Sequence, residues 1–492
     1  MKVLLIQPPF TIFKTEAKVC HPPLGLAYLA AVLKKDHDVL ILDTLAEGYS
    51  EESVVDREVK RYGLSFENIK KRIESFLPDV VGVSCLFSAQ TQNVKKICKL
   101  AKEIDKKAIT VIGGAHPSTL PEEMLEDSNV DFVVIGEGEE KIRKLLEYIE
   151  NKKDMQLEDM DGIGFRYNGS IKINGRNIYS TNLDTFPFPY WDAFPLERYF
   201  FIGAPHGGLT KKAPFLPVIT SRGCPFECIF CSVHNLWGRD YRKRSTENVL
   251  MELDYLVDRF GVKEILFEDD NLTLDKERAK EIFNGMINKK LEVNWSVPNG
   301  IAVQTLDEEM LELMKASGCH HISIGVESGD EYVLKNIIKK PIDLRIVKSV
   351  INKAKILGLE TTVFFVVGLP GETKRQLKNT FLLAEDLGAD NVNFFFATPL
   401  PGTRLLKVCK EKELIKGDLD FTRLKSDYPV FATEAYSIDE LKSVVFRERI
   451  KLYFLYALKN PQKFVRELWH KVLSDPKYFV RFILRYQKIK ND

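Results

Sequence analysis

The chain has 492 residues, which is more than one ordinary domain needs and enough for two or three. Hydrophobic residues make up 45% and charged residues 29%, a balance that is typical of globular proteins and excludes a disordered chain. The formal net charge of +1 gives no overall attraction to nucleic acid, so no nucleic-acid partner is expected. Because no apolar run reaches about 18 residues, the sequence predicts a cytoplasmic protein without a membrane span.

Residues 1–150 alternate short apolar segments, rich in Val and Ile, with helical patterns. Strands this apolar are buried on both faces, which predicts a parallel sheet between two layers of helices. Right-handed crossovers then favour a doubly wound, flavodoxin-like α/β domain. The predicted strands are Val3–Gln7, Val39–Asp43, Val80–Ser84, Thr110–Gly113 and Phe132–Gly136, and the predicted helices are Leu24–Lys35, Ile69–Phe76 and Gln92–Asp105.

Residues 151–200 break this alternation, and we interpret them as a linker that contains a β-hairpin. The segment Tyr167-Asn168-Gly169-Ser170 is a strong turn signal between Ile163–Arg166 and Ile171–Ile173. Prolines in Phe186-Pro187-Phe188-Pro189 then disfavour a helix. The aromatic residues that follow are expected to fix the linker to a domain surface; they are Tyr190, Trp191 and Phe194.

Residues 201–430 contain a second alternation of strands and helices. Six strand–helix units are two short of a closed eight-stranded barrel, so the sequence predicts a partial (β/α)6 barrel. The segment Thr305-Leu306-Asp307-Glu308 has the pattern of a capping box. The predicted strands are Leu216–Ser221, Glu264–Glu268, Val293–Val297, His321–Val326, Thr361–Val367 and Asn391–Ala397; the predicted helices are Thr246–Phe260, Lys276–Asn288, Asp307–Ala316, Leu344–Leu357, Lys374–Leu387 and Arg404–Lys412.

Residues 431–492 form a basic tail that is predicted to be helical. It begins with a second capping-box pattern, Ser437-Ile438-Asp439-Glu440, and residues 442–492 contain 13 Lys and Arg against four Asp and Glu. One interpretation is that the tail covers the barrel with its apolar side chains. The other is peripheral contact with an anionic membrane. The apolar residues are Phe446, Tyr453, Phe454, Phe464, Leu468, Trp469, Tyr478, Phe479, Phe482 and Ile483.

Three cysteines lie within eight residues directly after the first strand of the predicted barrel. Cys224, Cys228 and Cys231 have the spacing C-x3-C-x2-C. Thiolates are soft ligands that suit iron–sulfur clusters, and three of them hold three irons of a [4Fe–4S] cluster while the fourth iron stays open. The alternative is a structural zinc site, for which His234 is the nearby candidate for a fourth ligand.

This loop, ahead of a β/α series, resembles the radical S-adenosylmethionine (SAM) superfamily. The resemblance implies that the open iron chelates SAM, whose reductive cleavage gives methionine and a 5′-deoxyadenosyl radical. It implies SAM contacts from Phe230 to the adenine and from Glu327 to the ribose. The amino group would contact Glu268 and Asp269, in the acidic segment Glu268-Asp269-Asp270. The alternatives are purely structural roles: a core position for Phe230 and a helix cap for Asp270.

Segments of the first domain resemble the cobalamin-binding domain that precedes the barrel in one subfamily. They include Pro22–Leu29, and glycines at strand ends allow close approach of a large ligand. The first loop lacks the Asp-x-His-x-x-Gly motif, so the resemblance implies a cobalamin without a histidine ligand, or a domain that has lost cobalamin. The residues assigned to this cofactor are Gly113, Gly114, His116, Gly136, Glu137 and Gly138, and His116 is the one alternative cobalt ligand.

Together the resemblances imply a cobalamin-dependent radical SAM methyltransferase that acts on an unactivated carbon. Alternatives are a radical oxidative cyclase or rearrangement enzyme with the same cofactors, and a non-catalytic metal- or cobalamin-binding module. The expected partners are a small-molecule or lipid substrate and a reductant such as flavodoxin or ferredoxin. No catalytic side chain is assigned, because the cofactors carry the chemistry while the protein orients them.

Overall fold

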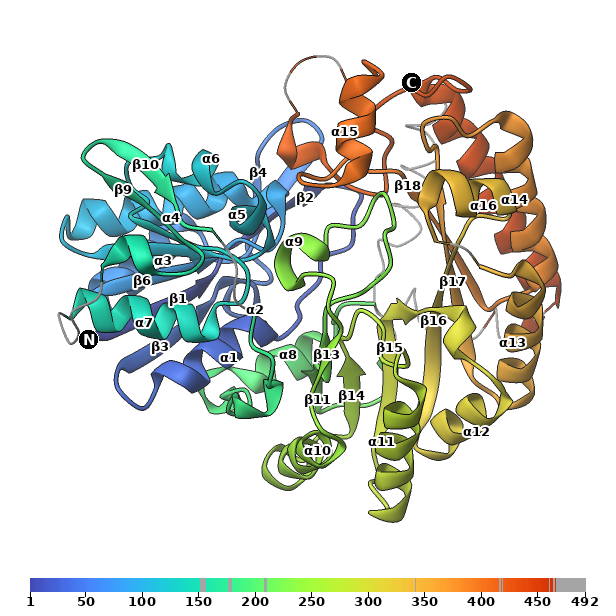
Figure 1. Ribbon diagram of the computed structural model, residues 1–492, viewed down its shortest axis with the longest axis horizontal. Helices are drawn as coiled ribbons and strands as arrows, with labels where there is room; N and C mark the ends of the chain where they lie inside the picture. Colours follow the sequence, from blue (N-terminus) through green and yellow to red (C-terminus); the bar gives the residue numbers. More distant parts are fainter. Residues whose placement is uncertain are drawn as a thin grey trace.

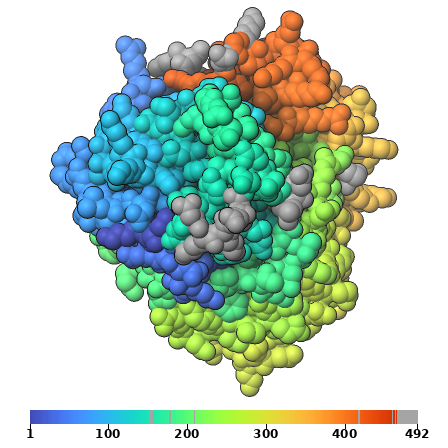
Figure 2. Space-filling view, turned by 60° about the vertical axis from the view of Figure 1, so that its left-hand side comes forward, coloured from blue at the N-terminus to red at the C-terminus, as the bar shows by residue number. Residues whose placement is uncertain are grey.

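The structure is a computed structural model that describes residues 1–150, 156–175, 179–207, 210–340, 342–415, 417, 419–459, 461–462 and 465. Two α/β units lie side by side, the N-terminal one in blue and teal and the barrel in green to orange (Figure 1). Their surfaces are continuous in the space-filling view (Figure 2). No helix within the described ranges has the length and apolar character needed to cross a membrane.

The N-terminal unit has five parallel strands in the order β8-β7-β6-β1-β3, which confirms the predicted flavodoxin-like sheet. Successive residues of β1 enter opposite cores: Val3 packs with α1 and α7, and Leu4 packs with α3 and α4. Burial on both faces therefore explains the apolar strands. The strands are β1 (Lys2–Gln7), β3 (Asp38–Asp43), β6 (Val80–Ser84), β7 (Ile109–Gly113) and β8 (Phe132–Val134); the helices are α1 (Leu24–Leu33), α3 (Phe66–Phe76), α4 (Thr91–Ile104) and α7 (Glu139–Ile149).

The predicted hairpin is present, but it belongs to the sheet rather than to a separate linker. Strands β9 (Ile163–Tyr167) and β10 (Ser170–Ile173) pair with each other, and β9 pairs antiparallel with β8. Asn168 and Gly169 have φ values of 49° and 79°, the left-handed conformation that a two-residue hairpin turn requires. The first sheet therefore continues beyond residue 150, where the sequence predicted a linker.

A small antiparallel sheet that the sequence analysis did not predict lies beside the first unit. Its strands are β2 (Phe10–Phe13), β5 (Val59–Tyr62) and β4 (Glu52–Val54). The linker aromatics are packed as expected: Trp191 is fully buried, and Lys34 lies 3.6 Å from the ring centroid of Tyr190. In α8 (Leu196–Ile202), Tyr199 donates a 2.6 Å hydrogen bond to Asp43 and so holds the linker against the first sheet.

The second unit is an open barrel of six parallel strands in chain order, which confirms the predicted partial barrel. Its strands are β11 (Phe215–Val218), β14 (Glu264–Phe267), β15 (Asn294–Ile301), β16 (Cys319–Glu327), β17 (Glu360–Val367) and β18 (Asn391–Phe396). Its helices are α10 (Thr246–Phe260), α11 (Lys276–Asn288), α12 (Glu308–Ala316), α13 (Leu344–Ile356), α14 (Lys374–Leu387) and α15 (Arg404–Glu411).

Of the two predicted capping boxes, one is correct. Ser437 and Glu440 exchange hydrogen bonds with each other's main-chain N–H at the start of α16 (Ile438–Lys459). The box at Thr305 is wrong: Asp307 caps α12 by accepting from the N–H of Met310, because its carboxylate is one residue from the helix. Helix α16 packs against β18, and the predicted apolar residues from Phe464 onward lie outside the described residues.

Candidate functional site

The cysteine loop follows the first barrel strand, at the carboxyl end where functional groups of a β/α barrel gather. Strand β12 (Ser221–Arg222) pairs with β13 (Arg242–Lys243) and closes the base of the loop. Gly223 has a φ of +90°, and a Cβ there would lie 2.2 Å from the carbonyl oxygen of Asp240. Only glycine fits this position, so the chain can turn from β12 directly into Cys224.

All three loop thiols are partly buried. Burial raises the pKa of Cys228 and Cys231 to about 12. Among the described residues, no group of three His, Cys, Asp or Glu side chains is spaced to hold a metal ion, so the thiols would have to draw together around a cluster. Nε2 of His234 donates to the carbonyl oxygen of Cys224 at 3.0 Å, which argues against His234 as a zinc ligand.

Asp269 supports the cysteine loop in this structure, whereas the resemblance placed it against SAM. Its side chain is 2% exposed and accepts from the N–H and hydroxyl of Thr220, at 3.0 and 2.7 Å, and from the hydroxyl of Ser221. Both partners lie in the short segment that leads from β11 into the loop. Strand β14 therefore fixes the loop through this carboxylate.

Replacing Asp269 with alanine should lower the iron content of the reconstituted protein. The change leaves the N–H and hydroxyl of Thr220 buried without their partner, a loss of about 1–3 kcal/mol for each unsatisfied group, and frees the loop from β14. Iron is measured after anaerobic reconstitution. Asp254→Ala, which removes an exposed partner of Lys289, is the control, and equal iron in both variants would contradict the supporting role.

Glu268 contacts two histidines instead of standing alone at the strand end. Its carboxylate lies 3.5 Å from Nε2 of His21 and 3.6 Å from Nδ1 of His206, and it accepts from Nδ2 of Asn299 at 3.0 Å. Burial lowers the pKa of His21 to about 4, while Glu268 raises the pKa of His206. Because His21 precedes α1, this cluster joins the first unit to the barrel, and contact of Glu268 with SAM stays a prediction.

Asp270 belongs to the segment that the resemblance placed at the SAM amino group, and a helix cap was its alternative interpretation. Asp275 caps α11 instead, by accepting from the N–H of Arg278 at 3.1 Å. Burial raises the pKa of Asp270 to about 7, with Asp269 contributing, and its Oδ2 has no hydrogen-bond partner among the described residues. Its charge also raises the pKa of the Cys224 thiol, after the larger effect of burial. The paired aspartates at a strand end were the available signal.

Glu327 ends β16 and forms a buried ion pair that the sequence analysis missed. Nζ of Lys340 lies 2.8 Å from Oε1 of Glu327 and donates to the carbonyl oxygen of Gly325 at 3.0 Å. In the cysteine loop, Phe230 is partly buried and packs against the large hydrophobic core that the two units share, in line with its core interpretation. Contacts of Phe230 with adenine and of Glu327 with ribose stay predictions.

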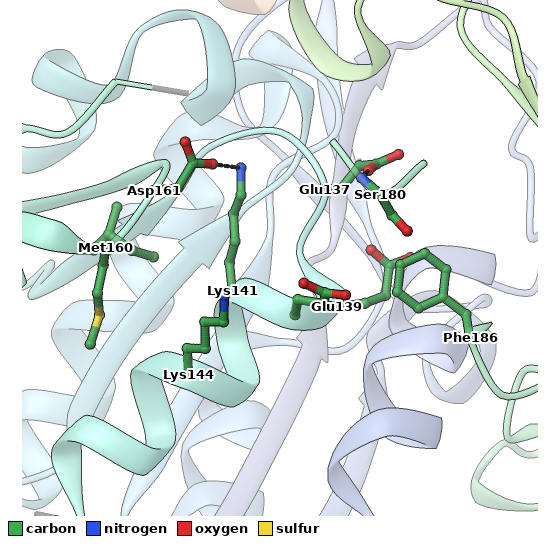
Figure 3. Close-up of a pocket in the computed structure, with 10 residues that line it drawn as sticks. Glu137, Glu139, Lys141, Lys144, Met160, Asp161, Ser180 and Phe186 are labelled. Atoms are coloured by element: carbon green, nitrogen blue, oxygen red, sulfur yellow. Dashed lines mark hydrogen bonds and ion pairs between the residues drawn. The ribbon is translucent and has the colours of Figure 1, made fainter. Parts of the chain in front are cut away.

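A buried network of charges joins the cysteine loop to the first unit. Arg222 contacts Glu137 at 3.2 Å and Glu139 at 2.5 Å, and Arg242 contacts Glu137 at 2.7 Å. Glu137 also accepts from the N–H of Ser180. Glu137 and Glu139 line one side of a small pocket (Figure 3), whose volume is about 50 Å³. This pocket is too small for a corrin, and Glu137 serves the domain contact where a cobalamin contact was expected.

The other predicted cobalamin residues are engaged within the first unit. His116 is buried, with Nδ1 2.9 Å from the hydroxyl of Ser88 and Nε2 2.7 Å from Glu123. A Cβ at Gly114, whose φ is +121°, would lie 2.7 Å from the carbonyl oxygen of Cys85. His116 therefore has protein partners at both nitrogens, which does not favour it as a cobalt ligand. Gly113 ends β7, Gly136 donates its N–H to Ser118, and Gly138 packs near Leu29.

Glu372 closes the loop that follows β17, and its environment favours the neutral carboxylic acid. Its Oε2 accepts from the N–H groups of Gly368 and Leu369, at 2.9 and 3.3 Å. Its Oε1 is buried without a hydrogen-bond partner in the described part of the chain. Burial raises the pKa of Glu372 to about 7, against an ordinary value of 4.5.

The stability of the protein should therefore fall as Glu372 ionises. The unfolded chain loses this proton near pH 4.5 and the folded chain near pH 7, so between these values the side chain removes about 1.4 kcal/mol of stability per pH unit. Glu372→Gln stays neutral, so its unfolding midpoint in urea should rise relative to wild type between about pH 5 and pH 8. A difference that is constant with pH would contradict this account.

Comparison with known proteins decides the family. A model of the B12 binding domain matches residues 11–146, and a model of the radical SAM superfamily matches residues 218–384. Cytidylyl-2-hydroxyethylphosphonate methyltransferase from Streptomyces wedmorensis is 36% identical over 83% of this chain and 81% of its own. The chain belongs to the radical SAM superfamily, in the branch with a B12-binding domain.

Other members of this branch differ in reaction. The anaerobic magnesium-protoporphyrin IX monomethyl ester cyclase from Rubrivivax gelatinosus is 28% identical over 90% of this chain and 75% of its own. The structure of the cobalamin-dependent radical SAM enzyme OxsB, with aqua-cobalamin and SAM bound, aligns with a TM-score of 0.71. That alignment covers 98% of this chain and 72% of OxsB at 18% identity, and it shows the shared fold.

Proposed function

We propose that this radical SAM enzyme is a cobalamin-dependent methyltransferase that acts on an unactivated carbon of a small molecule. The carrying observation is the position of the cysteine loop, at the carboxyl end of the barrel and against the carboxyl edge of the first sheet. Directly after the loop, α9 (His234–Trp237) packs on α5 (Ala115–Thr119), which follows β7 (Figure 1). A ligand bound between these two edges would contact both the B12-binding domain and the radical SAM domain.

The loop residues fit a [4Fe–4S] cluster and SAM. Cys224, Cys228 and Cys231 are proposed to hold three irons, and Asp270, whose Oδ2 is buried without a hydrogen-bond partner among the described residues, is proposed to accept from the SAM ammonium. Glu327 is proposed for the ribose, and Phe230 for the adenine. When bound, the cluster supplies the electron that cleaves SAM, and cobalamin supplies methyl transfer.

The first unit fits a corrin that has no histidine ligand. Leu86 and Phe87 follow β6 and are 47% and 52% exposed, which leaves an apolar surface at the carboxyl edge of the sheet. Phe10, after β1, contacts the ring of Phe87 at a centroid distance of 5.8 Å. Full-length protein purified anaerobically with hydroxocobalamin should retain the corrinoid, with the absorption spectrum of cobalt lacking a nitrogen ligand. Complete loss of corrinoid would refute the cobalamin part of the proposal.

The relative from S. wedmorensis suggests a first substrate. We propose a small, polar molecule, and test cytidylyl-2-hydroxyethylphosphonate with SAM, hydroxocobalamin and a low-potential reductant. With SAM labelled in its methyl group, the expected product is heavier by one labelled methyl in place of a hydrogen. Methyl-labelled product from any substrate supports the reaction type, whereas a turned-over substrate that never acquires the label contradicts it.

The similarity to the cyclase supports a second candidate function, an oxidative reaction without methyl transfer. The same cofactors would then form a ring or add oxygen without methyl transfer. Product mass separates the two candidates, because oxidation does not transfer the label from SAM. An external reductant is needed in both cases, and we propose one of the flavodoxin or ferredoxin class.

The alternative to a polar substrate is a lipid, which we propose together with peripheral membrane contact through the basic tail. On α16, Phe454 and Leu458 are 63% and 78% exposed, and Lys451 and Lys459 lie on the same helix. Exposed apolar and basic side chains together suit an anionic interface. Flotation with anionic and neutral liposomes tests this proposal, and equal behaviour with both at low salt would contradict it.

A further inference from the structure

Lys340 is a buried cation beside the cysteine loop. It is 8% exposed, and its ammonium donates to Glu327 and to the carbonyl oxygen of Gly325, at 2.8 and 3.0 Å. The N–H of Ile229, inside the cysteine loop, donates to the carbonyl oxygen of Ile338 at 2.9 Å. This main-chain bond fixes the segment that carries Lys340 against the loop.

The pair is held in a strained and crowded geometry. Glu327 has a φ of +69°, in the left-handed region that side chains other than glycine rarely adopt. A Cβ on Gly325 would lie 2.6 Å from Oε1 of Glu327 and 3.0 Å from Nζ of Lys340. Because desolvation makes a buried ion pair a poor source of stability, strain around such a pair points to a functional requirement.

The Lys340 ammonium acts electrostatically on the thiols of the cysteine loop. Burial raises the pKa of Cys228, and the strongest opposing effect is the Lys340 ammonium, which also opposes the rise at Cys224. Glu327 acts on Cys228 in the opposite direction and more weakly than Lys340. The ammonium therefore acts on the Cys228 thiol more strongly than the carboxylate does.

We propose that Lys340 sets the reduction potential of the cluster held by Cys224, Cys228 and Cys231; this inference rests on the proposed function. In the step concerned, one electron from an external donor of the flavodoxin or ferredoxin class reduces the cluster from the 2+ to the 1+ state. No bond is made or broken. A fixed positive charge stabilises the more negative, reduced state, so Lys340 raises the potential and ionised Glu327 lowers it.

The test is an anaerobic redox titration of full-length, reconstituted protein, followed by electron paramagnetic resonance. For Lys340→Met, the ratio of reduced to oxidised cluster at a fixed potential should fall about tenfold, a downward shift of about 59 mV for one electron. Glu327→Gln should shift the midpoint in the opposite direction. Lys340→Arg keeps the positive charge, so its midpoint should equal that of the wild type. Lys335→Met, which loses the same charge at an exposed position nearby, is the matched control.

An unchanged midpoint in a Lys340→Met protein with full iron content overturns the proposal. If Lys340→Met loses its cluster because Glu327 is left unpaired, the double variant Lys340→Met/Glu327→Gln decides, since it leaves neither charge. A midpoint below that of Glu327→Gln alone supports the proposal, and an equal midpoint overturns it. Wild-type protein that binds no iron refutes the proposed function itself, which distinguishes the two failures.

Discussion

Replacing Cys224, Cys228 and Cys231 together with alanine should reduce the iron content from about four atoms per chain to almost none. The three thiols lie on a single loop and are only partly buried, whereas the other five cysteines are buried. The charge-transfer absorbance of the cluster and the SAM-dependent activity should disappear with the iron. Iron analysis and visible absorption after anaerobic reconstitution measure the effect.

The control is Cys98→Ala, which removes a fully buried thiol from α4 in the first unit. Cys98 packs as a small apolar residue, so this variant should keep its iron, with at most a modest loss of stability. Iron that survives in the triple variant would contradict the assignment. Stoichiometric zinc without charge-transfer absorbance in the wild type would also contradict it, in favour of a structural site.

Replacing Arg222 with methionine should destabilise the contact between the two units by about 3–5 kcal/mol. Arg222 is 3% exposed, and its loss removes the arginine that contacts Glu139 and leaves Glu137 with Arg242 as its arginine partner. Although burial raises it, the pKa of Glu139 lies below its usual value because of Arg222 and then Arg242. Urea unfolding followed by tryptophan fluorescence is a suitable measurement, since the ring centroid of Trp237 lies 4.7 Å from Cζ of Arg222.

The matched control is Arg259→Met, which removes the exposed partner of Asp192 and should change the unfolding midpoint little, because exposed ion pairs contribute little to stability. Adding Glu137→Gln and Glu139→Gln to Arg222→Met removes the unpaired charges and should recover part of the lost stability. Equal unfolding midpoints for Arg222→Met and Arg259→Met would contradict the role of this network.

Hydrophobic periodicity accounts for most of the fold. The six barrel strands fall within a few residues of their predicted bounds, because apolar runs of four to eight residues between helical patterns encode buried parallel strands. The order of the first sheet follows from the handedness of its crossovers. The small β2-β5-β4 sheet lacked a comparable signal, and the membership of β9 in the first sheet depends on its pairing with β8, which no local pattern specifies.

The site was predictable where one loop carries it and unpredictable where distant residues meet. The spacing of Cys224, Cys228 and Cys231 indicates its chemistry directly. Arg222 and Glu137 are 85 positions apart, so their ion pair could not be inferred from either segment. The same holds for Glu268 with His21, and for Glu327 with Lys340. The sequence indicated that the carboxylates at strand ends are functional. Which of them support the cysteine loop and which face the site depends on their hydrogen-bond and ion-pair partners, which only the structure shows.

The most direct test of the central claim is the fate of SAM. Anaerobically reconstituted wild-type protein, incubated with SAM and a low-potential reductant, is analysed for 5′-deoxyadenosine by liquid chromatography and mass spectrometry. The account predicts 5′-deoxyadenosine and methionine in equal amounts from the wild type, and neither above background from the Cys224, Cys228 and Cys231 triple variant. Protein that holds about four irons and accepts electrons, yet leaves SAM intact, would contradict the account.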